Sequence, residues 1–179
     1  MKKIIITKML VSRFAPEQLI PAFALRYLSA KYHPIRPKIK HMYDNRDPNT
    51  LWWRVTTSNI DGKRVLRSRA ARKARAAFKQ ELKAQGFDAE GRKMDSDTAD
   101  SAVKNGLTGN MTGSLQMVLT PASTEGSYAA MREEMKSTVN ALIREQQKIQ
   151  IAREKQSRGS SQSQRAWESN SPRKKGANR

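Results

Sequence analysis

The chain has 179 residues, carries 35 Lys and Arg against 16 Asp and Glu, and has a formal net charge of +19. A compact domain with so much positive charge repels itself, so such a surplus is typical of proteins whose partners are rich in phosphate, or of proteins that bind anionic membrane surfaces. Cysteine is absent, which excludes disulfides, thiolate metal sites and cysteine nucleophiles. No apolar run approaches the ~20 residues that span a bilayer, so we do not expect an integral membrane protein.

The first 15 residues form a basic and apolar start. The segment MKKIIITKMLVSRF contains no acid, as is usual for an organelle transit peptide. It is nevertheless poor in Arg and Ser, and Ile4, Ile5 and Ile6 are β-branched residues that favour a strand. Residues 1–15 are therefore either a targeting segment or a buried strand.

A folded module is expected to begin at residue 16. Apolar residues recur at spacings of three and four between Pro16 and Tyr32, which predicts an amphipathic helix whose start Pro21 delays. In the next stretch, KYHPIRPKIKH, Pro34 and Pro37 predict extended backbone. This stretch is rich in cations, and it adds three candidate RNA contacts: Arg36, Lys38 and Lys40.

The segment 51–87 has the clearest local signals. LWWRVTTS has the composition of a strand, and Asp61 and Gly62 precede KRVLR, so the pattern predicts a β-hairpin. Ser68 fits the N-cap of a helix that runs to Gln85, and Gly86 fits its end. Phe87 is expected to fold back onto the last turn of that helix.

The predicted helix from Arg69 to Gln85 has two different faces. At ~100° per residue, one face gathers small and apolar residues for packing: Ala70, Ala71, Ala74, Ala77, Phe78 and Leu82. The remaining surface gathers cations, and these are our main candidate RNA contacts: Arg69, Arg72, Lys73, Arg75, Lys79 and Lys83. Only Glu81 interrupts the positive charge, whereas solvated helix faces usually mix both signs. Cations at this spacing can follow successive phosphates.

Two adjacent tryptophans lie in the predicted strand. Neighbouring residues of a strand point to opposite faces, so one of Trp52 and Trp53 is expected in the core. The other either covers the edge of the module or stacks on a base. We take Trp53, beside Arg54, as the candidate stacking residue.

The remaining chain is expected to contain a linker, a helix and a tail. Residues 88–126 are locally acidic and rich in Gly, Ser, Thr and Asn, which predicts a flexible linker; its short apolar piece 115–119 could dock as a strand or as a peptide. Residues 127–156 predict a second helix, capped by Ser127, that packs on a partner or on this chain. Residues 157–179 predict a disordered basic tail.

The sequence offers little for catalysis or metal binding. His33 and His41 have no acid or cysteine beside them, and the acidic triplet Asp95, Asp97 and Asp100 follows no apolar strand. No phosphate-binding glycine loop and no hydrolase motif is present. We expect no enzyme, cofactor, metal site or small-molecule substrate.

These observations predict an α+β module at 16–87, built from an N-terminal helix, a hairpin and a basic helix. The expected function is RNA binding, with ribosomal RNA as partner together with neighbouring proteins of a large particle. In composition the chain resembles ribosomal proteins, and its acid-free start is similar to accessory proteins of mitochondrial ribosomes, which implies the mitochondrial matrix. The alternative function is that of a nuclear or nucleoid DNA-binding or regulatory protein, for which PRKK at 172–175 could be part of a nuclear import signal. The alternative locations are the nucleus and the cytoplasm.

Overall fold

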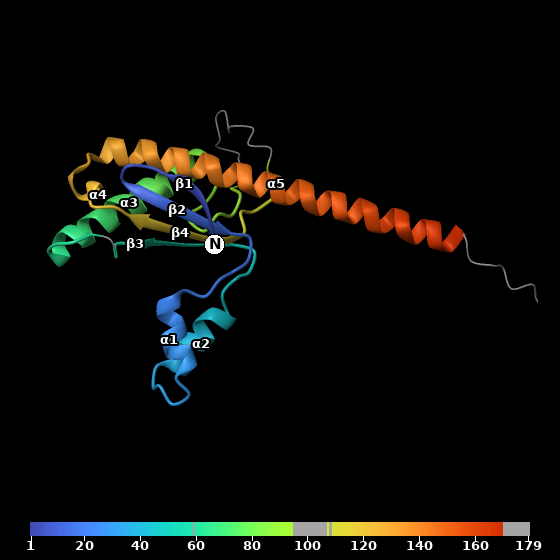
Figure 1. Cartoon of the computed structure of the whole chain (residues 1–179), viewed down its shortest axis with the longest axis horizontal. Coiled ribbons are helices and arrows are strands. Elements are labelled where there is room, and N and C mark those ends of the chain that lie inside the picture. Colours follow the sequence, from blue (N-terminus) through green and yellow to red (C-terminus); the bar gives the residue numbers. More distant parts are fainter. Residues whose placement is uncertain (59, 95–106, 108, 170–179) are drawn as a thin grey trace, which may run out of the picture.

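The protein is an α+β structure built on one mixed sheet. A computed structural model describes residues 1–58, 60–94, 107 and 109–169, with side chains as far as residue 152 (Figure 1). The sheet has the order β1-β2-β4-β3, in which β1–β2 and β2–β4 are antiparallel and β3–β4 is parallel. The α+β class agrees with the sequence prediction, although the arrangement of the elements differs in several places.

The first 15 residues form two strands, β1 (Lys2–Ile6) and β2 (Leu10–Ala15). The Thr7 N–H donates to the Leu10 carbonyl at 2.9 Å and closes the turn between them. The Glu134 carboxylate, from the last helix, accepts a 2.6 Å bond from the Thr7 hydroxyl and a 3.1 Å bond from the Met9 N–H. The β-branched start of the chain is thus an edge strand of the sheet.

Two short helices form an arm that projects from the sheet in Figure 1, away from the long helices α3 and α5. Helix α1 (Ala22–Ser29) is shorter than the predicted helix, because Pro21 stands at its start with extended backbone. Helix α2 (Arg36–Asp44) corrects the prediction of extended backbone after Pro34. Pro37 lies in the first turn of α2, where an amide N–H would have no helical acceptor, so it starts this helix instead of preventing one.

The predicted hairpin after residue 51 is wrong. Strand β3 (Leu51–Thr56) forms as expected, but KRVLR opens helix α3 (Arg64–Ala84), so Ser68 lies inside the helix and Lys63 stands at its N-cap. The partner of β3 is β4 (Gly113–Leu119), which runs parallel to it. Parallel neighbours need a crossover connection, and α3 supplies it where a hairpin turn could not.

The end of α3 follows the sequence prediction. Gly86 adopts a φ of 82°, a left-handed conformation that glycine takes without steric cost. The Phe87 N–H donates to the Leu82 carbonyl and the Gly86 N–H to the Lys83 carbonyl, both at 3.0 Å, which is the Schellman arrangement. Phe87 is buried in the same core cluster as Leu82.

Strand β4 lies inside the range 88–126, which we predicted to be a linker. All of its residues except Gln116 are buried, as expected for an inner strand that has neighbours on both sides. The docking of the apolar piece 115–119 as a strand was one of the predicted alternatives. The acidic triplet at 95–100 lies outside the described residues.

A short helix α4 (Ala122–Glu125) leads to the long helix α5 (Tyr128–Ser169), which extends well past the sheet in Figure 1. The Ser127 hydroxyl accepts a 3.1 Å bond from the Ala130 N–H, which is the predicted cap. The buried stripe of α5 begins with Met131, Met135 and Val139, and α5 packs on α3, β1 and β2. It continues through 157–169, where we expected disorder; residues 170–179 lie outside the described part of the chain.

The core lies between the sheet and the layer formed by α3 and α5. Alternate residues of the strands point into it, including Leu10 and Phe14 of β2 and Leu115 and Met117 of β4. The opposite face of the sheet, which we call the open face, carries the residues in between. On β3 these are Trp52, Arg54 and Thr56.

Ser12 is a buried polar residue in β2, and its replacement tests whether its hydroxyl lacks a hydrogen-bond partner in the core. Its side chain is fully buried, and its hydroxyl has no hydrogen-bond partner among the described residues. Ser12→Ala is therefore expected to raise the free energy of unfolding by about 1 kcal/mol, because it removes an unsatisfied buried group. Ser123→Ala is the control: its hydroxyl donates to the Thr120 carbonyl at 2.7 Å, so that variant should lose about 1 kcal/mol in urea unfolding. Destabilisation by Ser12→Ala would mean that the hydroxyl is paired.

Candidate nucleic-acid interface

Helix α3 presents opposite faces to the core and to solvent, as predicted. Every residue of the predicted packing face is buried, and Ala74, Ala77, Phe78 and Leu82 are fully so. Five of the six predicted cations are exposed, while Lys73 is half-buried. The small alanines bring α3 close to the sheet and fix the direction in which its arginines point.

The one acid of α3 does not neutralise this surface. Glu81 is buried, and its carboxylate accepts a 2.5 Å bond from Nε of Arg132 on α5. This hydrogen bond raises the pKa of Arg132. The pair joins the two long helices. Glu81 therefore contributes to packing, and the outer surface of α3 stays positive.

A groove of about 660 Å³ lies between the start of α3 and the end of β3. Arginine side chains dominate its wall, beside the small polar residues Thr57 and Ser68. The four arginines that line it are Arg64, Arg67, Arg72 and Arg75. A guanidinium presents its donors in a planar fork that matches phosphate oxygens, so this groove has the chemistry of a phosphate-binding surface.

The groove continues along β3 toward the open face. A neighbouring hollow of about 720 Å³ shares Thr57, Arg67 and Arg75 with the groove, and adds Arg54 and Phe23. Phe23 and Arg54 also line a pocket of about 280 Å³ beneath the arm. We call this series of three hollows the arginine track; its lining arginines are Arg46, Arg54, Arg64, Arg67, Arg72 and Arg75. No Asp or Glu is among its described lining residues.

The structure separates the predicted cations of α3 into groups. Arg72 and Arg75 lie on the arginine track, whereas Lys79 and Lys83 are exposed further along the helix. Lys73 points elsewhere, because its ammonium donates to the Gly126 carbonyl. Burial, and then the neighbouring Arg69, lower the pKa of Lys73.

The other predicted contacts lie outside the arginine groove at the start of α3. Arg36, Lys38 and Lys40 belong to α2 in the arm, and Arg36 donates to the Lys31 carbonyl at 3.1 Å. Trp53 is the tryptophan on the core side of the sheet, and it also lines two hollows of the arginine track. Its ring lies 4.9 Å from that of Phe78, and its indole N–H donates to the Ala89 carbonyl at 2.7 Å.

No family model, curated protein or solved structure matches this chain. Within the described residues, no group of three or more His, Cys, Asp or Glu could hold a metal ion. The described helices include none long and apolar enough to cross a membrane.

Sequence reasoning missed four arginines of the track: Arg46, Arg54, Arg64 and Arg67. Arg64 and Arg67 were assigned to a strand of the predicted hairpin, which removed them from the basic helix. A helical count from Lys63 onward would have placed Arg64, Arg67 and Arg75 near one another, because they are separated by three and eight residues. Arg46 and Arg54 come near α3 only through the packing of the arm and the sheet, which leaves no local signal.

Proposed function

We propose that this chain is a non-catalytic RNA-binding protein that acts as a structural part of a ribonucleoprotein particle. The arginine track carries the proposal: six arginines and no described acid line one continuous surface from α3 to the open face. Arginine side chains bind phosphates and aromatic side chains stack on bases, and this surface carries both kinds of side chain. The net charge of +19 supports a polyanionic partner.

The shape of the track favours a single strand over a duplex. The track turns from the outer surface of α3, past β3 at the end of the sheet, to the open face. A duplex has a persistence length of about 50 nm and would not follow such a turn within one small domain. Unpaired RNA bends easily and exposes its bases, so we place RNA before DNA as the partner.

The particle that we propose is the ribosome, including the mitochondrial ribosome, or one of its assembly intermediates. Ribosomal RNA offers many unpaired loops to a small basic protein, and the projecting arm and the long α5 offer separate surfaces to neighbouring proteins (Figure 1). Location in the mitochondrial matrix is part of this proposal. Gradient sedimentation of a cell extract tests it: the chain should migrate with a large particle, and ribonuclease should release it.

Salt dependence tests the contact with phosphates directly. If the six arginines each meet one phosphate, the slope of log K against log salt for single-stranded RNA should be about −4. Affinity is measured by fluorescence anisotropy between 50 and 300 mM salt, with duplex RNA and duplex DNA of equal length as controls. Tighter binding to duplex DNA, or a slope near zero, would contradict the proposal.

A further inference from the structure

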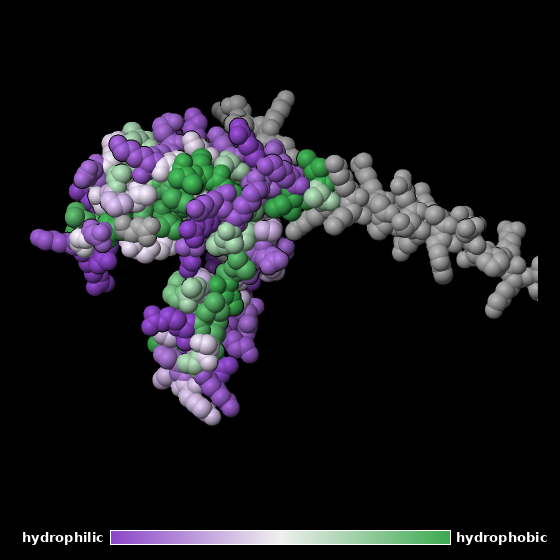
Figure 2. Space-filling model, in the orientation of Figure 1, coloured by the Kyte–Doolittle hydropathy of each residue, from purple (hydrophilic) through white to green (hydrophobic). Residues whose placement is uncertain are grey.

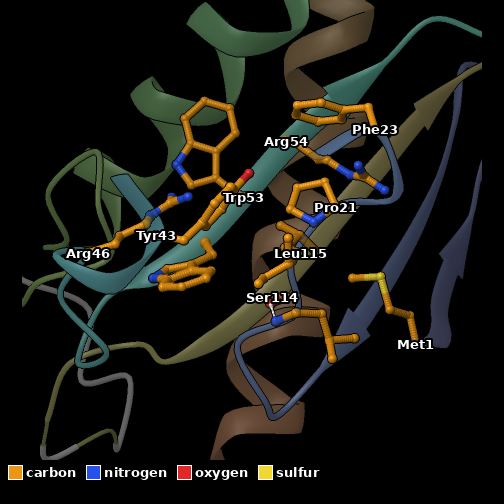
Figure 3. Close-up of a pocket in the computed structure, with 12 residues that line it drawn as sticks. Met1, Pro21, Phe23, Tyr43, Arg46, Trp53, Arg54, Ser114 and Leu115 are labelled. Carbon is orange, nitrogen blue, oxygen red and sulfur yellow. Dashed lines mark hydrogen bonds between the residues drawn. The ribbon is translucent and has the colours of Figure 1, made fainter. Parts of the chain in front are cut away.

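The pocket at the end of the arginine track lies beneath the arm. It has a volume of about 280 Å³, and its aromatic and basic side chains come from α1, from β3, and from the end of α2 and the segment after it. Figure 3 shows Phe23 next to Arg54 on one side, and Tyr43 next to Arg46 on the other. A pocket of this size is at the low end for bound ligands, so it suits one small group.

The arm is held above the open face by hydrogen bonds close to the pocket. The Leu19 N–H donates to the Ser114 hydroxyl at 2.7 Å, which fixes the segment before α1 on the inner strand β4 (Figure 3). The Trp52 indole N–H donates to the Asp47 carbonyl at 3.1 Å, which fixes the segment after α2. The pocket is therefore formed by the folded chain before any ligand arrives.

The lining pairs aromatic rings with arginines. The Arg46 guanidinium lies 4.5 Å from the centre of the Trp52 ring, and that of Arg54 lies 5.9 Å from the centre of the Phe23 ring. The exposed fraction of Phe23 is 57%, so much of its ring is open to a ligand. In Figure 2, hydrophobic atoms run along the arm up to the sheet, with hydrophilic residues on both sides.

Arg54 has no described carboxylate as its partner. It donates to the Gln116 side-chain oxygen at 2.9 Å, and this amide bears no charge. Burial lowers the pKa of Arg54, because removing a cation from water disfavours its charge. An anion at this position would supply the missing counter-charge, and a phosphate next to a stacked base is such an anion.

We infer that this pocket binds one unpaired nucleotide, with its base against Phe23 and Trp52 and its phosphate on Arg54 and Arg46. The inference rests on the proposed function, since it gives the RNA strand an end point on the arginine track. Every nucleobase has a flat face that stacks on an aromatic ring, so the pocket adds affinity for unpaired bases without requiring a given sequence.

The test compares two probes that carry the same phosphates. One is a single-stranded 12-mer of uridylate, and the other is a 12-mer of the same ribose-phosphate backbone without bases. Stacking on an aromatic side chain corresponds to roughly 5- to 150-fold in affinity, so the parent should prefer the uridylate probe by about that factor. Phe23→Ala should remove most of this preference and leave the slope against salt unchanged.

Two further variants make the result specific. Phe23→Tyr keeps the ring and should bind like the parent. Leu25→Ala removes another exposed apolar side chain from α1, outside the pocket, and should also leave the preference intact. If the parent binds both probes equally well, with a steep dependence on salt, the nucleotide pocket is wrong but the proposed RNA binding stands. The same holds if Phe23→Ala keeps the preference for the uridylate probe. Absence of binding to both probes would instead overturn the proposed function.

Discussion

Replacing Arg67, Arg72 and Arg75 together by glutamate is expected to lower the affinity for single-stranded RNA by roughly 100-fold or more. A hydrogen bond that involves a charged group contributes about 1.5–3 kcal/mol, and the variant replaces three such contacts by repulsion. All three side chains are exposed, so the free energy of unfolding should change little. Anisotropy titration at fixed salt measures the first effect, and urea unfolding measures the second.

The control for this variant carries the same change in charge at another place. Lys8, Lys136 and Arg144 are exposed on the β1–β2 turn and on α5, outside the arginine track. Their joint replacement by glutamate lowers the net charge equally, so it should weaken binding only through the long-range field. Equal losses in the two variants would show that the total charge binds RNA and that the track has no special role.

Phe78→Ala is expected to lower the free energy of unfolding by about 3–5 kcal/mol. Phe78 is fully buried at the junction of α3 and β3, where its ring contacts Trp53. A loss of that size is a large part of the stability of a small domain. Because Phe78 fixes α3 relative to the edge of β3, the arginines on the two elements lose their spacing, and RNA binding should weaken although no charge is removed.

Lys79→Ala, at the next position of the helix, is the control for this second variant. Its side chain is exposed, so the substitution should change the unfolding free energy by at most about 0.5 kcal/mol. Denaturant titration followed by circular dichroism measures both variants. If Phe78→Ala unfolds at the same denaturant concentration as the parent, the result would contradict the packing of α3 on the sheet through Phe78.

Local patterns predicted the helices that pack on the core better than they predicted the sheet. The spacing of the alanines, Phe78 and Leu82 identified the buried face of α3, since that face depends only on helical periodicity. Gly86 identified the end of the helix for an equally local reason. The hairpin failed because KRVLR has strand composition, whereas β3 finds its partner in β4, beyond the whole of α3.

Only those residues of the candidate site that lie on one helix could be predicted, because their shared surface depends on local periodicity. Arg72 and Arg75 belong to a single helix, so their common surface follows from the sequence, and the structure places both on the arginine track. Arg46 and Arg54 reach the track only because the arm folds over the open face. The choice between Trp52 and Trp53 also required the strand register, which places Trp53 against Phe78 and Trp52 on the open face, although both line the pocket beneath the arm.

The position of β4 in the sheet has a consequence for the nascent chain during synthesis. Leu10 of β2 pairs with Leu119 of β4, and β4 is the only strand neighbour of β3 among the described residues. Before β4 leaves the ribosome, the sheet consists of an isolated hairpin and a separate strand, which are at best marginally stable in water. The domain therefore folds late, through contacts distant in the sequence, and such folding is slow. A truncated product that ends before Gly113 would carry all six arginines of the track without the surface that spaces them.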